Sequence, residues 1–272
     1  MAIWALMYWF RDGISWHSFV HGYSRKVWFW FFGIYMLRSI GVSLGYHRLF
    51  THRSFKCHFF TQEVIHFFGA MAAQGHWYDW RRNHKQHHWD TEGPWDPHTP
   101  TKYKGIKGLL WAHMGWLFFE VKEPPNAEVI FALGRENTTM ANWRWDKTVY
   151  FLGMLSGFVL PFIFAGFPGL LLAGFGGVVV SLEFTWAINS WDHFRLVFHK
   201  KGVHGRTVKE QSKNSPLIAI PNFSGEPWHE NHHRMASVAF LGWRWWQIDM
   251  PKWVLIGGEN FGIFWDINRP PV

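Results

Sequence analysis

A single stretch, residues 148–190, carries only one formal charge, Glu183. A helix needs about 20 apolar residues to cross the hydrocarbon core of a bilayer, so this stretch has room for two crossings. The helix-breaking sequence Gly-Phe-Pro-Gly at 166–169 divides it near the middle. The sequence therefore predicts two membrane-spanning helices, at 149–167 and 169–189, joined as a tight hairpin. The alternative is a soluble protein with buried core helices, which two abutting runs with so little charge make much less favourable.

Two other apolar segments lie nearer the start of the chain. Residues 27–45 are long enough for a third span and are interrupted by one charge, Arg38. Residues 1–10 are apolar but reach only about half of a span, so we expect a partial span, a re-entrant segment or an anchor at the membrane surface. They lack the basic flank and the small-residue cleavage site of a secretory signal peptide.

The basic residues predict which side of the membrane the polar segments occupy. The chain has 27 Lys and Arg against 19 Asp and Glu, a formal net charge of +8, and 23 of the 27 lie in residues 47–147 and 190–272. The hairpin turn has none. By the positive-inside rule, both polar segments face the cytoplasm. Arg11, Arg25 and Lys26 are exceptions, because they fall in a segment that is then predicted to be external.

These patterns predict an all-α integral membrane protein with one domain over residues 1–272. The apolar helices form the membrane part, and residues 47–147 and 190–272 form a cytoplasmic helical cap. The basic charge could also suit nucleic acid, but the sequence has no zinc finger, RNA-recognition motif or helix-turn-helix signature. We therefore expect no nucleic-acid partner, and we interpret the charge as a topological signal and as attraction for the phosphates of anionic lipids.

Histidine is the unusual residue of this sequence, with 18 copies against a single cysteine, Cys57. One cysteine excludes an intramolecular disulfide framework and a cysteine-rich metal site. Any bound metal must therefore be held by imidazole and carboxylate. Half of the histidines fall into one H-x4-H pattern and two H-x-x-H-H patterns, together with one isolated histidine. These are His47 and His52; His84, His87 and His88; His229, His232 and His233; and His193.

Helix geometry indicates how these patterns could work. Each H-x-x-H-H pattern presents three imidazoles on one face of a helix, because positions i, i+3 and i+4 lie on the same side. The H-x4-H pair does not share such a face, so we expect the helix to end or bend between His47 and His52. Asn189 and His193 lie four residues apart and can point to one place. The histidines outnumber the ligands of a single zinc site, which indicates two metals, and imidazole suits Zn, Cu, Fe or Ni.

The remaining histidines form no comparable pattern. His98 and His113 are intermediate cases, and we assign no special function to the others, including His66 and His76. Acidic residues near the clusters could hold the second nitrogen of a ligand imidazole, although for any one of them a solvated loop charge is the more ordinary interpretation. These acids are Asp79, Asp90, Asp96, Asp192, Glu226 and Glu230.

The order and spacing of the motifs resemble those of the membrane fatty acid desaturases, specifically the Δ9 group of stearoyl-CoA and acyl-lipid desaturases. Gly-Tyr-His-Arg-Leu-Phe-Thr-His-Arg-Ser-Phe at 45–55 resembles the first histidine box, and residues 74–88 resemble the second. Gly-Glu-Pro-Trp-His-Glu-Asn-His-His at 225–233 resembles the third. The resemblance covers residues 27–250 in the family's order. Shorter matching motifs lie at 95–98, 111–116, 184–190 and 245–249.

The resemblance implies an enzyme that uses O2 and two electrons at a di-iron centre. It would place a cis double bond, at the Δ9 position in this group, into a saturated fatty acyl chain. It also implies nine histidine ligands and an asparagine, Asn189, that holds a water at one iron. The implied ligands are His47, His52, His84, His87, His88, His193, His229, His232 and His233.

The resemblance further implies how substrate and electrons arrive. Gln74, Trp80, Thr185 and Trp186 would line a bent acyl tunnel, and Arg82 would lie near the headgroup of the acyl carrier. The sequence leaves open whether that substrate is an acyl-CoA, an acyl-[acyl carrier protein] or an acyl lipid. Because the sequence lacks the H-P-G-G haem motif of a fused cytochrome b5 domain, we expect a separate electron donor, either ferredoxin or a cytochrome b5 system.

The chain departs from the family's pattern without losing a ligand. Pro227 and Glu230 are unusual in the third box, Asn83 is unusual before the second, and Phe240 replaces the arginine of an A-R-x-G motif. Only one full span precedes the first box, where the family has two. These departures bear on the docking of headgroup or donor and on the anchoring of the N-terminal segment.

Two other functions stay open at this point. A di-iron fatty acid hydroxylase or lipid ketolase would share the histidine boxes and differ in its product. A non-catalytic, histidine-rich metal-handling membrane protein is a more remote alternative. A transporter would place its ligands within the spans near the bilayer midplane, whereas here the histidines lie at the ends of the predicted spans and in the polar segments.

Overall fold

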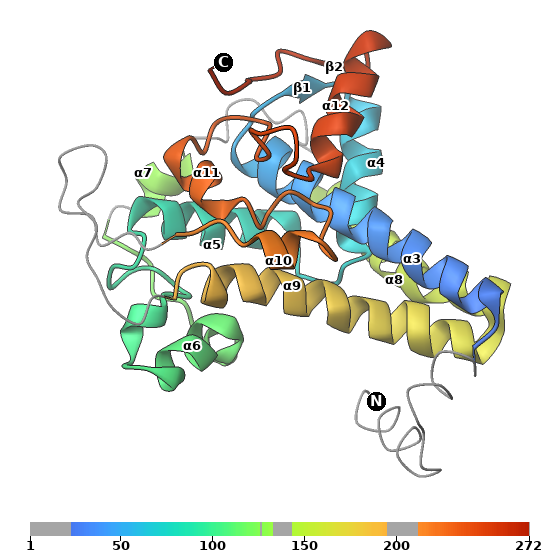
Figure 1. Cartoon of the computed structure of the whole chain (residues 1–272), viewed down its shortest axis with the longest axis horizontal. Helices are drawn as coiled ribbons and strands as arrows, with labels where there is room; N and C mark the ends of the chain where they lie inside the picture. The colour runs from blue at the N-terminus through green and yellow to red at the C-terminus, as the bar shows by residue number, and fades with distance from the viewer. Residues whose placement is uncertain (1–22, 126, 133–142, 195–211, 272) are drawn as a thin grey trace.

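The computed structural model describes residues 23–125, 127–132, 143–194 and 212–271. Within them the chain is mostly helical with few strands (Figure 1), which confirms the helical character of the predicted fold. The predicted partial span at 1–10 lies outside the described residues.

Helices occupy the apolar stretches and the histidine boxes. The α-helices are α3 (Arg25–Ile40), α4 (Phe59–Ala70), α5 (Trp77–Trp89), α6 (Ile106–His113), α7 (Ala127–Ala132), α8 (Trp143–Gly169), α9 (Gly177–Trp191), α10 (Pro216–Ala219), α11 (His229–Arg234) and α12 (Met250–Asn260). Two π-helical segments, η1 (Gly41–Thr51) and η4 (Leu170–Gly176), follow α3 and connect α8 to α9. The remaining elements are the 3-10 turns η2 (Pro100–Lys102) and η3 (Gly115–Phe118) and the strands β1 (Lys56–Cys57) and β2 (Phe264–Trp265).

Two helical units are long and apolar enough to cross a membrane, residues 25–51 and 146–191. The second reverses direction at Gly166, which has a φ of 66° that suits glycine, within the turn that the sequence predicts. Its first leg has about 20 residues, or about 30 Å of helix, which matches the thickness of a bilayer's hydrocarbon core. Large apolar side chains are exposed along both units, as expected for contact with lipid. They include Phe29, Phe32, Phe151, Phe162 and Ile163.

Arg38, the charge inside the predicted 27–45 span, is fully buried. A charged group in such a position needs polar partners, and here they are backbone carbonyls that come from three other segments. The guanidinium therefore ties α3 to α8, to η4 and to the residue that follows α4. Its acceptors are the carbonyl oxygens of Met71, Gly157, Ala173 and Gly174, at 2.8–3.1 Å.

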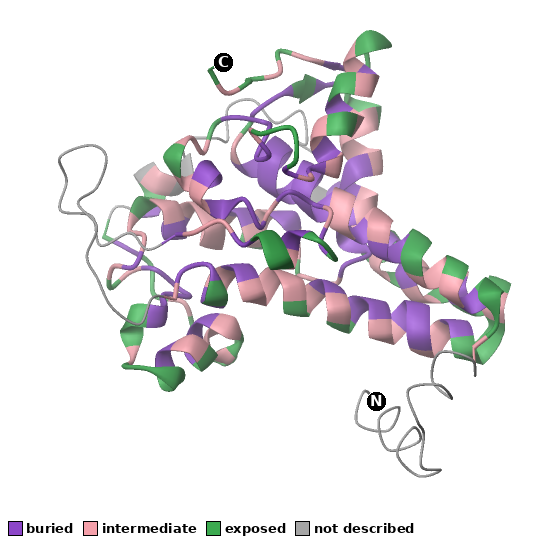
Figure 2. Ribbon diagram, in the orientation of Figure 1, coloured by how far each residue is buried: buried purple, intermediate pink, exposed green. Residues whose placement is uncertain are grey.

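The C-terminal segment folds back over the first histidine box. Residues 239–264 pack against η1 and α5, and Figure 2 shows a continuous buried region where they meet. β1 and β2 pair antiparallel, with Cys57 opposite Phe264. This packing holds the end of η1 against the segments that carry α11. The buried cluster includes Leu44, Tyr46, Phe50, Phe55, Trp77, Phe240, Leu255 and Phe264.

The second histidine box begins at a well-defined helix start. His76 precedes α5 with extended backbone angles, and its ring accepts a hydrogen bond from the Tyr78 amide. Asp79 lies in the first turn, where a negative charge stabilises the positive end of the helix dipole. The helix then runs unbroken through all three histidines of the box.

The start of η1 and the end of α4 approach so closely that only glycine fits. A Cβ atom at Gly41 would lie 2.1 Å from the amide nitrogen of Gly69, which is far inside van der Waals contact. Gly33, earlier on α3, has nothing within 4 Å of the corresponding point. Alanine substitutions at Gly41 and Gly33 therefore separate the effect of close packing on stability from the effect of helix propensity.

We expect Gly41→Ala to lower the free energy of unfolding by at least about 1–3 kcal/mol, because backbone rather than a flexible side chain must move. Gly33→Ala should leave it unchanged or raise it by up to about 1 kcal/mol, since alanine favours helix and displaces nothing. The midpoint of thermal unfolding in detergent measures both. Equal midpoints for the two variants would contradict the close approach of η1 and α4.

Candidate metal centre

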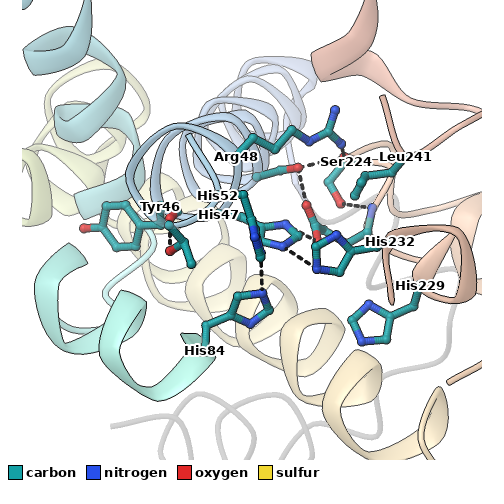
Figure 3. A network of polar contacts seen from close by, with 12 residues as sticks. Tyr46, His47, Arg48, His52, His84, Ser224, His229, His232 and Leu241 are labelled. Carbon is teal, nitrogen blue, oxygen red and sulfur yellow. Dashed lines mark hydrogen bonds and ion pairs between the residues drawn. The ribbon is translucent and has the colours of Figure 1, made fainter. Parts of the chain in front are cut away.

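The nine predicted histidines come from four parts of the chain and meet in one place. Two lie at the end of η1, three on α5, three on α11 and one just beyond α9. Their ring nitrogens form two groups, and within each group these atoms all lie within 4.8 Å of one another. Figure 3 shows the labelled rings of the first group facing one another. The first group is His47, His52, His84, His88 and His232; the second is His87, His193, His229 and His233.

The helix ends between His47 and His52, as expected, because η1 stops at Thr51 and His52 is its C-cap residue. The sequence did not predict that this last segment is a π-helix, in which the amide of residue i+5 bonds to the carbonyl of residue i. The His52 amide donates to the His47 carbonyl at 3.0 Å, and the two ring centroids lie 4.8 Å apart. Residues i and i+5 share a face of a π-helix, so H-x4-H is the spacing that this geometry requires.

Each H-x-x-H-H box contributes to both groups. On α5 the i, i+4 pair His84 and His88 belongs to the first group, and His87 belongs to the second. On α11 the assignment is reversed, because the i, i+4 pair belongs to the second group and His232 to the first. The two helices therefore face each other across both groups.

The ring nitrogens that face one another are arranged so that they could bind metal cations. Neighbouring Nε2 atoms lie 2.8–3.3 Å apart, in pairs such as His88 with His232 and His193 with His229. A neutral imidazole has one proton, so a ring that uses its Nδ1 proton on a carboxylate presents a lone pair at Nε2. Facing lone pairs repel unless a cation lies between them. Donor sets of five and four imidazoles fit two transition-metal ions.

Burial keeps these rings in the form that binds metal. Burial lowers the pKa of each imidazole well below the ordinary 6.5, and neighbouring imidazoles lower it further, so the rings are neutral at pH 7. The rings concerned are His52, His84, His87, His88, His229, His232 and His233. His193 differs: burial alone would lower its pKa, but the hydrogen bond and the charge of Glu92 raise it.

Three carboxylates lie behind these rings, two of them buried and one half-buried. A carboxylate at Nδ1 fixes the tautomer and the orientation of a ligand histidine and makes Nε2 a better donor. The burial penalty on Glu226 is outweighed by the nearby charges of His47 and Arg48, so its pKa is lowered. The contacts are Glu226 Oε2 at 2.8 Å from His47 Nδ1, Asp96 Oδ2 at 2.9 Å from His87 Nδ1, and Glu92 Oε1 at 2.8 Å from His193 Nδ1.

The sequence underrated these acids. A solvated loop charge is the wrong interpretation for Asp96 and Asp192, which are buried, and for Glu226, which is half-buried and contacts His47. It suits Glu230, which pairs with Arg234 on the outer side of α11. Glu92 was missed altogether, because it lies in a polar turn, with a φ of 59°, that nothing in the sequence marks as buried.

A buried ion pair joins the first box to the start of α12. Arg48 and Asp249 are 1% and 0% exposed, and their side chains meet at 2.9 Å. Arg48 also donates to the carbonyls of Ser224 and Ala239, at 2.8 and 2.7 Å. Asp249 accepts the backbone amide of Leu241. The hydrogen bond from Arg48 to the Ser224 carbonyl holds the segment before α11 against η1, near His47 (Figure 3).

Three of the predicted substrate residues form a hydrogen-bonded bridge. Gln74 Nε2 donates to Thr185 Oγ1 at 2.8 Å, and Trp80 Nε1 donates to Gln74 Oε1 at 3.2 Å. A cavity lies on each side of this bridge, and both cavities reach His84 and Asn189. The inner cavity runs along α3 and α9, and the outer one opens beside η3. The inner cavity is lined in part by Tyr35, Val42, Phe184 and Ile188, and the outer one by Trp116, Phe119 and Leu182.

The other two predicted substrate residues lie farther out. Trp186 lines the outer cavity but not the inner one. Arg82 lines neither cavity that reaches His84; it forms an ion pair with Glu123 and borders a neighbouring hollow with Asp79 and Asn83. Because Asp79 and Asn83 also line the outer cavity, Arg82 lies near its mouth.

Known proteins align with most of the chain. No protein-family model matches it. The hex-5-enoyl-[acyl-carrier protein] acetylenase of Moorena producens is 32% identical over 254 residues, which cover 88% of this chain and 75% of that protein. The Delta-9 desaturase-like 5 protein of Arabidopsis thaliana is 31% identical over 88% of this chain and 76% of its own length. The sn-1 stearoyl-lipid 9-desaturase of Synechocystis is 29% identical over 86% and 69%.

The fold and the site define a class of protein, a helical protein with clustered histidines that could hold metal ions beside helices long and apolar enough to cross a membrane. The relatives make the assignment more specific. The chain belongs to the Δ9 fatty acid desaturase family, whose members introduce double bonds into fatty acyl chains. This confirms the family that the histidine boxes predict.

We expect Glu226→Gln to weaken metal affinity by about 10–100-fold, because the amide cannot hold His47 as a carboxylate does. The measurement is the metal retained per chain by mass spectrometry after challenge with a chelator. Glu230→Gln is the matched control, since it removes the same charge four residues farther on, outside the groups. Equal retention in both variants would contradict a role for Glu226 behind His47.

Proposed function

We propose that the protein is an O2-dependent fatty acyl desaturase that places a cis double bond, at the Δ9 position, into a saturated acyl chain at a di-iron centre. The observation that carries the proposal is the pair of histidine groups, five and four rings, in a chain of the Δ9 desaturase family. Several relatives are named as 9-desaturases of acyl lipids, which supports the Δ9 position.

The ligand assignment follows the two groups. One iron would bind the five rings of the first group, and the other the four rings of the second, with Asn189 holding a water there. When bound, iron activates O2 strongly enough to remove hydrogen from an unactivated methylene, which no side chain can do. The reaction removes two hydrogens from adjacent methylenes and reduces O2 to two waters with two electrons and two protons.

The chain's own residues position the substrate and exclude water. An acyl chain has no polar group along its length, so a protein can select a position on it only by the depth and shape of the cavity. The bridge of Gln74, Trp80 and Thr185 separates the two cavities beside His84. We assign it the task of bending the acyl chain there, so that one pair of methylenes faces the histidine groups. Trp186 and Arg82 would act nearer the carrier end.

The topology and the partners follow from charge and chemistry. We place the histidine groups on the cytoplasmic side, where the positive-inside rule puts the basic polar segments. The electrons would come from a separate ferredoxin or cytochrome b5 system. The acyl carrier is a CoA, an acyl carrier protein or a lipid, each of which has anionic phosphates that suit a basic surface.

The first test is the fatty acid profile of a desaturase-deficient host that expresses the chain. We expect a new monounsaturated acid, two hydrogens lighter than its precursor, with its double bond at carbon 9. His232→Ala should abolish it while the protein accumulates normally. An added oxygen would instead indicate the hydroxylase or ketolase alternative, and metal binding without any new lipid would indicate the non-catalytic one.

The second test concerns the bridge. Thr185→Val keeps the shape of the side chain but leaves Gln74 Nε2 without its acceptor. We expect a mixture of double-bond positions or a several-fold loss of product at unchanged metal content, because the bend is no longer fixed. Thr61→Val, a half-buried position on α4, is the matched control. An unchanged product pattern in Thr185→Val would contradict the positioning role of the bridge.

A further inference from the structure

A third histidine–carboxylate cluster lies outside the nine-histidine groups. It joins three elements: His66 on α4, His76 before α5, and Asp146 in the first turn of α8. Asp146 Oδ1 lies 3.3 Å from His66 Nδ1, and Asp146 Oδ2 lies 3.0 Å from His76 Nε2. The ligand-capable atoms of the three residues all lie within 4.8 Å of one another.

His66 is the part of this cluster that ordinary packing does not explain. Its side chain is 0% exposed, and neither ring nitrogen has a hydrogen-bond partner, although Asp146 is close. Glu63, one turn earlier on α4, also has a buried oxygen, Oε2, without a partner, 3.9 Å from His66 Nδ1. Leaving buried polar atoms unsatisfied costs about 1–3 kcal/mol each. A cation between them would satisfy these atoms together.

The distances fit a shared cation better than direct hydrogen bonds. In a tetrahedral zinc site with bonds of about 2.0–2.1 Å, neighbouring ligand atoms lie about 3.3 Å apart and point at the metal rather than at each other. His66 Nδ1 and Asp146 Oδ1 have this separation without hydrogen-bond geometry. Burial lowers the pKa of His66 to about 4, so at pH 7 the ring is neutral and offers a lone pair.

The surroundings orient the cluster and separate it from the nine histidines. Trp77 Nε1 donates to Asp146 Oδ1 at 2.7 Å and holds the carboxylate in place. The rings of Tyr46 and Phe50 each lie 6.2 Å from the His66 ring. Tyr46 points away from the nine-histidine groups (Figure 3), so the cluster lies on another side of η1.

We propose that His66, His76 and Asp146 bind a structural divalent metal ion of the zinc class, with Glu63 or a water as the fourth ligand. The donor set, two imidazoles and one or two carboxylates, is one that zinc accepts. The ion fastens α4 and the start of α5 to the first turn of α8. His76 gives up one contact on binding, the hydrogen bond that its Nδ1 accepts from the Tyr78 amide, because Nδ1 must carry the proton when Nε2 binds metal.

The test is a zinc titration of the purified, iron-loaded full-length protein, followed by gel filtration and measurement of zinc and iron per chain. We expect one zinc per wild-type chain, lost in Asp146→Asn and in His66→Gln with iron unchanged. His58→Gln, an exposed histidine directly before α4, is the matched control and should retain zinc. Equal zinc in wild type and Asp146→Asn would overturn the proposal.

A second measurement covers variants that fail to fold. Zinc should raise the thermal midpoint of the iron-loaded wild type, and Co2+ in its place should give the visible absorption of a tetrahedral site. If neither effect occurs in the wild type, the proposal is overturned. The outcome is independent of the desaturase proposal, because zinc can bind when no unsaturated product forms and can be absent when product does.

Discussion

The arrangement of this protein depends on one electrostatic constraint, which is that nine buried or half-buried imidazoles face one another at 2.8–3.3 Å. Where two lone pairs meet at this distance, a cation between them removes the repulsion, and other groups must hold the rings in place. The carboxylates of Glu92, Asp96 and Glu226 supply that support at Nδ1. Arg48 holds the segment before the third box against η1 through the Ser224 carbonyl, and it holds the start of α12 through Asp249.

The same constraint explains the connection between metal centre and membrane. Histidines of the two groups lie at the end of η1 and just beyond α9, which are the ends of the two apolar units. A cavity that runs along α3 and α9 therefore reaches His84 and His229. Arg38 stabilises the packing of the helices around this cavity. Its carbonyl partners come from segments that must pack together for the cavity to exist.

Much of the site could be predicted from sequence, because H-x-x-H-H spacing and the order of the boxes are local patterns. The π-helical form of η1 could not be predicted, because the H-x4-H spacing alone does not distinguish a π-helix from an α-helix that ends between the two histidines. The roles of Glu92, and of Asp249 paired with Arg48 across 201 residues, depend on burial and tertiary contact. His66 and His76 have no local pattern at all, and only the packing of α4, α5 and α8 brings them to Asp146. The turn at Gly166 could be predicted because the helix-breaking residues Gly and Pro stand close together in the sequence at 166–169.

The most direct test of the central claim is an anomalous difference map, collected at the iron absorption edge, from crystals of the active protein. We predict two iron peaks, one among the five rings of the first group and one among the four rings of the second. A single peak, or peaks away from His88, His232 and His193, would contradict the assignment of the nine histidines to a di-iron centre.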